Sequence, residues 1–519
     1  MKIKEFTFVN DCFQNKYNDE NELFGQTLNN TIFASLMSVY EKYEAVIGLE
    51  CHIQLLTKTK MYSNDVAEYG ALPNTNVSVI SLGHPGTLPM VNKTAIEFAV
   101  KLGLAVNANI REENQFARKN YFYADLPKGY QVTQDKTPIC TGGFVNYKDK
   151  DQDKRLNLTR IHMEEDAGKS IHDVDPFHTL IDLNRAGTPL LEIVTEPELR
   201  TGEEAYAYLN EVRKLVRYLE ICDGNMEEGS LRCDANISVR IKGASEFGKK
   251  VEVKNMNSFR NVQRAIDFEI KRQIDLVEKN EIIAVETRSF DAVNGSTFSL
   301  RSKESANDYR YFPEPDLQPV YVTKSYIDTI KSKMPVLPAQ LFERYTKEYG
   351  LSDYDAFQLT ELKEIAAYYN ELVSQTKNYK SAANWLMGTI RSSLNDRAIT
   401  IQKFELKPAK IAEIIKLIDD GKVSNTAAAA KLFPELIANS TASAEDMAKK
   451  LDLIQNSNSE DLQGFINSVL EKFPAKVNEY KGGKVGLLGM FVGEVMKASK
   501  GKADPKLLNT LVKETLDKK

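Results

Sequence analysis

From residue 43 onward, the chain carries short runs of alternating apolar and polar residues that are interrupted by glycine and proline. Runs of this kind, bounded by turn residues, predict β-strands. Two longer stretches, residues 203–220 and 258–279, have apolar residues at helical spacing and predict amphipathic helices. Strands in runs with few helices among them favour an α+β domain on a mainly antiparallel sheet. The predicted strands cover residues 45–53, 156–162, 190–195, 235–241 and 251–253.

After Pro338 the pattern changes to amphipathic helices joined by short loops. Such small helices are typical of compact appended modules rather than of a catalytic core. The predicted helices cover residues 338–349, 362–375, 381–392, 408–420, 423–433, 444–451, 459–473, 485–500 and 505–516, with glycine breaks at 482–483 and 500–501.

The chain has 519 residues, too many for one ordinary hydrophobic core. Residues 1–42 are polar and Asn-rich, and we assign this extension no function. We predict three domains after it: a catalytic domain over 43–325, a helical domain over 326–405 and a small helical tail domain over 406–519.

The composition, 42% hydrophobic and 27% charged, is that of a soluble globular protein. No apolar run approaches the ~18 residues of a membrane span, and the first residues lack the apolar core of a secretory signal. Five scattered cysteines without a CxxC pair argue against a disulfide framework or a thiolate zinc site. We therefore expect a cytoplasmic protein without a membrane segment.

The net charge of −5 does not mark the whole chain as a polyanion binder. Residues 481–519 are an exception, with nine lysines against four acids. This local excess could seat a phosphate backbone, and the alternative is a solvated helix face. The lysines are Lys481, Lys484, Lys497, Lys500, Lys502, Lys506, Lys513, Lys518 and Lys519.

Acidic residues beside glycines and basic residues form the candidate chemistry of the first domain. On a strand, Glu50 and His52 point to one face and Cys51 to the other. The other blocks cover residues 160–169, 182–192, 227–236 and 252–259.

These residue types suit the activation of a carboxylic acid, which does not accept ammonia until its hydroxyl becomes a good leaving group. Phosphoryl transfer supplies that group and depends on positioning and charge neutralisation. Carboxylates at strand ends make Mg²⁺ ligands, while Lys169, Arg185 and Lys254 make phosphate clamps. The chain has neither GxxxxGK[ST] nor GxGxxG, so the site is not a P-loop or kinase-type site.

Each signal also has a plainer interpretation. A single acid on a strand is usually exposed or paired with a basic residue, and the acids at 164–166 could form a solvated turn. His162 could be a buried histidine beside a core strand or part of a site. The aromatic run at 120–130 could belong to the core.

Taken together, the blocks resemble the B subunits of the heterotrimeric aspartyl/glutamyl-tRNA amidotransferases over most of the chain from Tyr43. The motifs are GLE with His52, RKNYFY at 118–123, HMEEDAGK at 162–169, NRAGTPL at 184–190, Glu196-Pro197, MEEGSLRCDAN at 226–236, KN at 254–255 with NSF at 257–259, DYRYFPEPD at 308–316, NWLMG at 384–388 and GEVMK at 493–497.

The resemblance implies a cradle domain similar to glutamine synthetase, then a helical domain and a tail domain that binds tRNA. It implies phosphorylation, with ATP and Mg²⁺, of the side-chain carboxylate of misacylated Glu-tRNA(Gln) or Asp-tRNA(Asn). Ammonia then comes through a tunnel from the A subunit, which is a glutaminase, and the C subunit completes the heterotrimer. Which misacylated tRNA is used stays open.

The resemblance also implies roles for individual residues. Catalytic roles fall to Glu165, Lys169 and Arg185, and nucleotide or phosphate contacts to Lys254, Asn255 and Ser258. The strip at 308–310 has no assigned role. The implied metal ligands are Glu50, His52, Glu164, Glu165, Glu192, Asp234 and Glu252.

Two departures from the family pattern stand out. Many members carry a four-cysteine zinc knuckle early in the cradle, where this chain has Ser63, Asp65, Ser78 and Ser81. Hydroxyls do not replace thiolates as zinc ligands, so we expect no structural zinc. Cys51 stands where the family usually has Val, and we interpret it as a small buried hydrophobe.

Two other functions compete with this interpretation. A stand-alone carboxylate kinase or ligase would use free ammonia, and the absence of a glutaminase signature fits both enzymes. The other alternative is an RNA-binding adaptor with a degenerate site. It is disfavoured because residues that can bind a metal ion stand at all the proposed metal positions.

Overall fold

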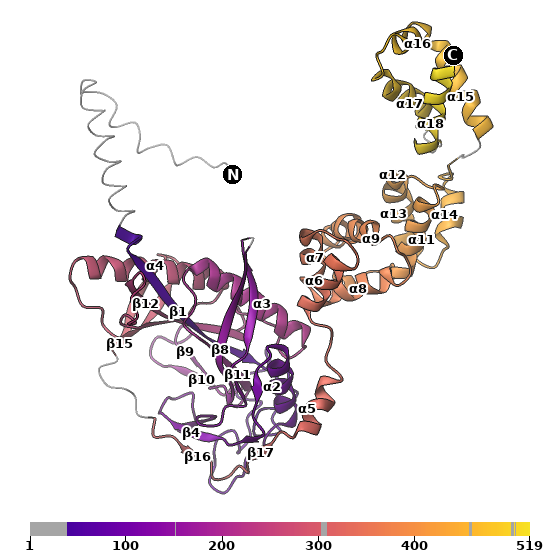
Figure 1. Cartoon of the computed structure of the whole chain (residues 1–519). Coiled ribbons are helices and arrows are strands. Elements are labelled where there is room, and N and C mark those ends of the chain that lie inside the picture. The colour runs from indigo at the N-terminus through magenta and orange to yellow at the C-terminus, as the bar shows by residue number, and fades with distance from the viewer. Residues whose placement is uncertain are drawn as a thin grey trace, which may run out of the picture. The chain divides into compact units, whose positions relative to one another are not determined.

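The computed structural model describes residues 39–150, 152–302, 309–455, 459–499, 503 and 505–518. The chain divides into two compact units, and the boundary along the chain falls between Pro335 and Val336 (Figure 1). Most of the predicted N-terminal extension lies outside the described residues, as do Asp308 and the lysines at 500, 502 and 519.

A ten-stranded sheet forms the centre of the first unit, in the order β15-β14-β13-β12-β1-β11-β8-β6-β2 with β7 paired to β8. Among the described strands every pair in it is antiparallel except β13–β14. Its strands are β1 (Tyr43–Gln54), β2 (Asn109–Ile110), β6 (Cys140–Thr141), β7 (Phe144–Asp149), β8 (Gln152–Glu165), β11 (Pro189–Thr195), β12 (Leu231–Ile241), β13 (Val251–Lys254), β14 (Glu286–Asp291) and β15 (Ser296–Ser302).

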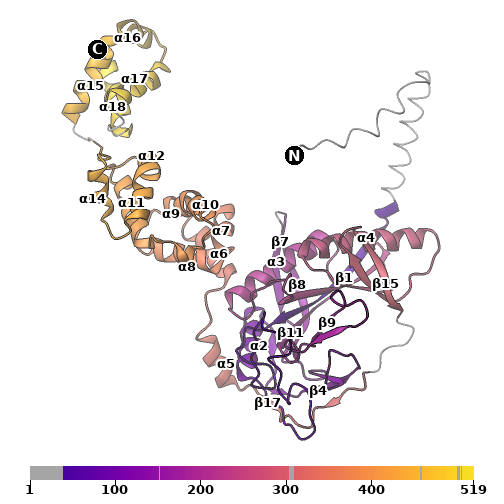
Figure 2. The same cartoon turned by 180° about the vertical axis from the view of Figure 1, so that it is seen from behind.

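Two amphipathic helices, α3 (Gly202–Tyr218) and α4 (Phe259–Glu278), cover one face of this sheet (Figures 1 and 2). Thr201 and Glu204 form a capping box at the start of α3, and Ser258 caps α4. Cys51 of β1 is fully buried on this covered side, 3.9 Å from the sulfur of Cys233. Cys51 was predicted to be buried and to point to the face opposite Glu50 and His52, and both predictions are confirmed.

Short strands build the opposite side of the unit. β4 (Ala117–Asn120) pairs with β5 (Tyr130–Thr133) and with β16 (Phe312–Pro313). Arg118 joins the same segments, because its guanidinium donates to both oxygens of buried Glu314, at 2.7 and 2.8 Å. The remaining elements are α2 (Lys93–Ala105), β3 (Glu113–Asn114), β9 (Lys169–Ile171), β10 (Leu180–Asp182), β17 (Val320–Tyr321) and α5 (Lys324–Lys331).

The residues at the four expected knuckle positions come together in space. The hydroxyl of Ser81 donates to the carboxylate of Asp65 and lies 3.2 Å from the hydroxyl of Ser63. The amide of Ser78 donates to the same carboxylate at 2.9 Å. The fully buried ammonium of Lys60 lies 3.9 Å from that carboxylate and donates to two backbone carbonyls. We call these five residues the serine–aspartate cluster.

All the described elements of the second unit are helices or helical turns. They are α6 (Pro338–Lys347), α7 (Asp353–Thr360), α8 (Lys363–Val373), α9 (Tyr379–Trp385), the π-turn η1 (Leu386–Ile390), α10 (Arg391–Asp396), the 3₁₀ turn η2 (Ile401–Lys403), α11 (Pro408–Asp419), α12 (Asn425–Ala427), the π-turn η3 (Ala428–Leu432), α13 (Phe433–Ala438), α14 (Ala444–Lys450), α15 (Ser459–Lys472), α16 (Pro474–Lys481), α17 (Leu487–Ala498) and α18 (Pro505–Lys518). The last four share a buried core around Leu462, Phe491 and Leu508.

Both the mainly antiparallel sheet and the helical C-terminal region agree with the predicted pattern. The sequence pattern missed α2, α5, α7, α13, α16 and most of the short strands, and β8 extends well beyond the predicted strand at both ends. In the described parts of the chain, no helix combines the length and the apolar character that a membrane span requires.

Candidate functional site

Alternate residues of the central strands gather on the face of the sheet opposite α3 and α4. His52 of β1 lies opposite Glu192 of β11, and Glu192 lies opposite His162 of β8. On the other flank of β1, Glu50 lies opposite Asp234 of β12. Side chains directly opposite each other on one face are in contact distance, so antiparallel register alone assembles these groups.

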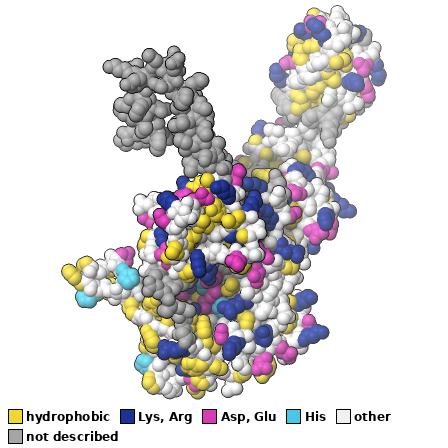
Figure 3. Space-filling model, turned by 60° about the vertical axis from the view of Figure 1, so that its left-hand side comes forward, with side chains coloured by type: hydrophobic (Ala, Val, Ile, Leu, Met, Phe, Trp, Pro, Cys, Tyr) yellow, Lys and Arg dark blue, Asp and Glu magenta, His cyan; other side chains and the backbone are white. Residues whose placement is uncertain are grey.

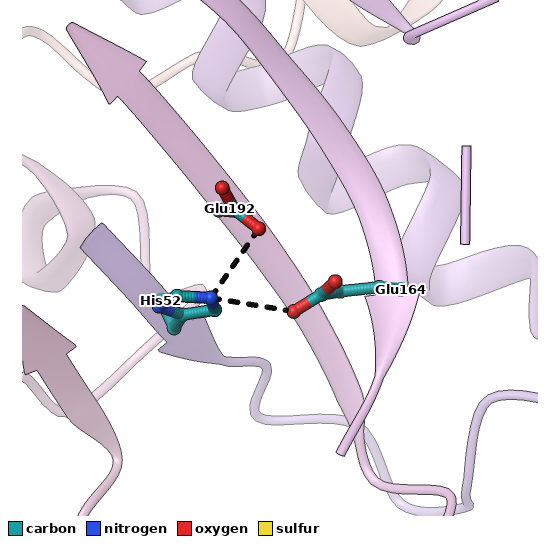
Figure 4. A group of neighbouring side chains, drawn as sticks. All are labelled: His52, Glu164 and Glu192. Atoms are coloured by element: carbon teal, nitrogen blue, oxygen red, sulfur yellow. Dashed lines mark ion pairs between the residues drawn. The ribbon is translucent and has the colours of Figure 1, made fainter. Parts of the chain in front are cut away.

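His52, Glu164 and Glu192 form what we call the first cluster (Figure 4). The Nε2 atom of His52 lies 3.3 Å from Glu192 Oε2 and 3.6 Å from Glu164 Oε1. The Nε2 atom of His162 lies 3.2 Å from the same oxygen of Glu192. Three strands, β1, β8 and β11, thus aim their polar groups at one point.

Electrostatics couple the two histidines to the two carboxylates. Burial alone lowers the pKa of His52, but its hydrogen bond to Glu192 and the charges of Glu192 and Glu164 raise it overall. Burial also lowers the pKa of His162, but the nearby carboxylates of Glu164 and Glu192 raise it overall, to about 9. Burial raises the pKa of Glu192, but the two imidazoles hold it well below its ordinary value. The first cluster therefore keeps Glu192 ionised.

Glu50, Asp234 and Glu252 form the second cluster, in which one ligand atom of each residue lies within 4.8 Å of the others. The ammonium of Lys254 donates to Asp234 and lies 3.0 Å from Glu252 Oε1. The amide of Asn236 donates to Glu50 at 2.8 Å. Burial lowers the pKa of Lys254, but the charges of Asp234 and Glu252 raise it overall.

A cavity of about 370 Å³ is lined by the whole first cluster, by Asp234 of the second cluster and by Lys254. Its remaining wall includes Lys119, Tyr121 and Arg232. Figure 3 shows acidic side chains gathered in a hollow of the first unit, with Lys and Arg side chains around it. The cavity therefore combines carboxylates that can hold cations with donors that can hold phosphate.

Asp166 anchors one wall of this cavity. Its buried carboxylate accepts from Gln54 at 2.7 Å and from Arg232 at 2.9 Å, and Arg185 lies 3.7 Å away. Burial raises the pKa of Asp166, but the two guanidiniums and these hydrogen bonds lower it overall. Arg185 also donates to the backbone carbonyls of the two residues after Asp166. Asp166 thus fixes where Arg232 stands.

Lys119 closes another wall, and its ammonium lies 4.9 Å from the ring centre of Tyr309 and 5.8 Å from that of Tyr121. Burial lowers the pKa of Lys119, but the charge of Glu164 raises it overall. Asn120 donates to the backbone carbonyl of Tyr309 at 3.0 Å. Residues 309 and 310, to which the sequence analysis assigned no role, thus pack against β4 and support Lys119.

The structure does not bring Glu165 to either cluster. It follows Glu164 on β8 and points to the opposite face, where Lys128 donates to it and the amide of Val132 donates at 3.0 Å. It lines a separate cavity of about 290 Å³ with Lys60 and Lys128.

Three residues that were predicted to contact phosphate, Lys169, Ser258 and Asn255, differ in where they lie relative to the 370 Å³ cavity. Lys169 is exposed on β9, outside the lining of the cavity. The hydroxyl of Ser258 accepts from the amide of Asn261 at 3.1 Å and so caps α4. Asn255 lines the cavity with a left-handed φ of 63°, a conformation that asparagine tolerates better than most residues.

Several residues of the cavity were not predicted from the sequence as site residues, namely Lys119, Tyr121, Asp166 and Arg232. Strand alternation could have indicated Arg232, because it precedes Asp234 by two residues on β12. The same alternation places His162 on the same face of β8 as Glu164. This favours a role for His162 in the site over that of a buried histidine beside a core strand. The others depend on contacts between distant segments.

The donor sets of both clusters fit divalent cations. The first offers two carboxylates and an imidazole, and the second offers three carboxylates. Within the described residues, the buried Nδ1 atom of His162 has no hydrogen-bond partner. Its Nε2 atom faces Glu192, as expected of a group that orients a ligand rather than binds the cation.

Comparison with known proteins identifies the family. The model of the GatB/GatE catalytic domain matches residues 45–328, and that of the GatB domain matches residues 367–516. The B subunit of the aspartyl/glutamyl-tRNA(Asn/Gln) amidotransferase of Thermodesulfovibrio yellowstonii is 47% identical over 471 residues, which covers 91% of this chain and 98% of that protein. The corresponding B subunit of Alkalilimnicola ehrlichii is 47% identical over 481 residues, covering 92% and 100%. The chain therefore belongs to the family of aspartyl/glutamyl-tRNA(Asn/Gln) amidotransferase B subunits.

Proposed function

We propose that this chain activates the side-chain carboxylate of misacylated Glu-tRNA(Gln) or Asp-tRNA(Asn) by ATP-dependent phosphorylation. Ammonia from a glutaminase partner then displaces the phosphate and leaves the amide. The observation that carries the proposal is the pair of carboxylate clusters beside one cavity that also presents Lys119, Arg232 and Lys254. Phosphoryl transfer needs this combination of cation ligands and phosphate donors.

The chain's own residues take distinct parts in this reaction. Both clusters hold Mg²⁺ in the proposal, and bound Mg²⁺ neutralises phosphate oxygens and polarises the phosphoryl group. Arg232, held in place by Asp166, and Lys119, held by its aromatic neighbours, contact the anionic groups. His162 orients Glu192 in the first cluster.

Membership of the family also supports a proposal for the assembly. We propose that the A and C subunits complete the enzyme and that the first unit is a cradle similar to glutamine synthetase. In this proposal the tail domain over residues 406–519 contacts tRNA, and its helices α15–α18 use lysines of residues 481–519. Lys497 and Lys484 pair with Glu494 and Glu479, at 2.7 and 3.3 Å, so phosphate contacts would have to displace these surface pairs.

An amidation assay tests the proposal. The chain is assembled with its partner subunits, and both misacylated tRNAs are tested with glutamine, with and without ATP. We expect ATP-dependent amidation, its loss in Glu192→Gln, and unchanged activity in the exposed control Glu281→Gln. ATP-independent amidation, or full activity of Glu192→Gln, would contradict the proposal.

Two further arms address the alternatives and the tail. Efficient amidation of the chain alone with ammonium chloride would favour the stand-alone ligase. Deletion of residues 459–519 should weaken tRNA binding in a filter assay without removing Mg²⁺ binding. Unchanged tRNA affinity would exclude α15–α18 as a tRNA contact.

A further inference from the structure

Arg310 has an unusual backbone conformation beside the cavity. Its φ is 44°, in the left-handed region that residues with a Cβ atom rarely adopt. Asn255, which lines the 370 Å³ cavity, also has a left-handed φ, but the short polar side chain of asparagine tolerates this conformation. An arginine side chain gives no such relief, so the surrounding fold must hold Arg310 in this conformation against its energetic cost.

Asn120, the last residue of β4, supplies the contacts that hold this backbone. Its side-chain amide donates to the carbonyl of Tyr309 at 3.0 Å and to the carbonyl of Arg310 at 2.9 Å. Its backbone amide also donates to the carbonyl of Tyr309, at 3.1 Å. Three hydrogen bonds from one residue thus fix residues 309 and 310 to β4.

These contacts place Arg310 beside the wall of the cavity. Lys119 and Tyr121, the chain neighbours of Asn120, both line the cavity. The ring centre of Tyr309 lies 4.9 Å from the ammonium of Lys119 and 6.2 Å from the ring centre of Tyr121. Arg310 follows Tyr309 and is exposed, which brings a long cationic side chain to the rim of the cavity.

We propose that Arg310 binds a phosphate group of a substrate at this rim, and that its strained backbone is retained for the contact. The inference deepens the proposed function and rests on it. A guanidinium pairs with phosphate through two parallel hydrogen bonds, and both ATP and aminoacyl-tRNA carry phosphates. Lys119, Arg232 and Lys254 line the same cavity, so Arg310 extends their positive field to its rim.

Substitution by glycine separates binding from folding at this position. Arg310→Gly removes the guanidinium and also the strain, because glycine adopts a positive φ freely. A structural arginine should lose stability on this change, whereas a phosphate-binding arginine should lose affinity alone. Arg310→Lys keeps a cation without the planar fork. Glu220→Gly is the matched control, because Glu220 is exposed with a φ of 57° just after α3, which covers the opposite face of the sheet.

Three measurements are made on each variant, and the first two use the enzyme assembled with its partner subunits. They are the affinity for a non-hydrolysable ATP analogue by equilibrium dialysis, the affinity for misacylated tRNA by filter binding, and the thermal unfolding of the full-length chain. Arg310→Gly should weaken the binding of one ligand on the order of tenfold or more, and its unfolding temperature should equal or exceed that of the unaltered chain. The ligand affected identifies whether ATP or tRNA supplies the phosphate. Arg310→Lys should retain part of the affinity, and Glu220→Gly all of it.

Two results would overturn the inference while leaving the proposed function intact. One is unchanged affinity of Arg310→Gly for both ligands, although the unaltered enzyme amidates tRNA. The other is a loss of affinity accompanied by a lower unfolding temperature, which would make Arg310 a structural residue. An unaltered enzyme without ATP-dependent amidation would instead refute the proposed function, and the inference with it.

Discussion

Glu164 and Glu165 are neighbours on β8, and their carboxylates point to opposite faces of the sheet. Glu164 lies 3.6 Å from the Nε2 atom of His52, whereas Glu165 accepts from Lys128 and from the amide of Val132. Two adjacent acids of one motif therefore stand in two different cavities. Substitutions at the two positions should have effects of different kinds.

We expect Glu164→Gln to weaken divalent-cation binding on the order of 100-fold, because it removes one of the anionic ligands of the first cluster. Glu165→Gln should keep cation binding but lower the free energy of unfolding by about 1–3 kcal/mol, because Lys128 loses its buried charged partner. Calorimetric Mn²⁺ titration and thermal unfolding measure both. Loss of cation binding in Glu165→Gln at full stability would restore Glu165 as a metal ligand.

Lys60 makes stability depend on pH. Its ammonium is fully buried, and burial lowers its pKa to about 8 although Asp65 opposes the shift. Between pH 8 and 10.5 the unfolded chain therefore binds more protons at this residue than the folded chain does, so its contribution to stability rises with pH. Over this window, the unaltered protein should gain roughly 1–2 kcal/mol relative to Lys60→Met. Denaturant unfolding of both proteins at several pH values measures the difference. A constant difference would contradict the lowered pKa.

Arg118 should anchor the strip at residues 309–316. Removal of Glu314 leaves this largely buried guanidinium without its bidentate partner. Glu314→Ala should therefore lower the free energy of unfolding by about 3 kcal/mol. Hydrogen exchange of residues 309–321 should accelerate as the strip leaves β4. Glu405→Ala is the matched control, because it breaks the exposed bidentate pair with Arg397 and should leave unfolding unchanged. Equal effects of the two substitutions would exclude the anchoring role.

The serine–aspartate cluster should tolerate conversion into a metal site. Since Ser63, Asp65, Ser78 and Ser81 already converge, replacing all four by cysteine should create a tetrahedral zinc site. The variant should bind one more Zn²⁺ per chain than the unaltered protein, which carries the same carboxylate clusters, and its unfolding temperature should rise more on adding Zn²⁺. A cysteine variant that binds no additional Zn²⁺ would show that the four positions do not share ligand geometry.

The facing of Glu50 and His52 could be predicted because strand alternation is local, and the buried Cys51 confirms it. The position of Glu165 could not. The acids at 164–166 look like a turn, but β8 continues through Glu165 because that residue pairs with Pro189 of β11. Such pairing depends on residues far away in the sequence. For the same reason, the neighbours of Lys119 and the partners of Asp166 become visible only in the folded chain.

The alternation of β1 also makes the strand sensitive to length. Leu49, Cys51 and Ile53 are buried in the core, whereas Glu50, His52 and Gln54 alternate with them and lie on the face that carries the two clusters. A single-residue insertion at this point would exchange the two sets, placing carboxylate and imidazole groups against α3 and apolar groups in the cavity. An insertion of two residues would keep the facing and change only the register. In this strand, an odd change in length disrupts core and chemistry together.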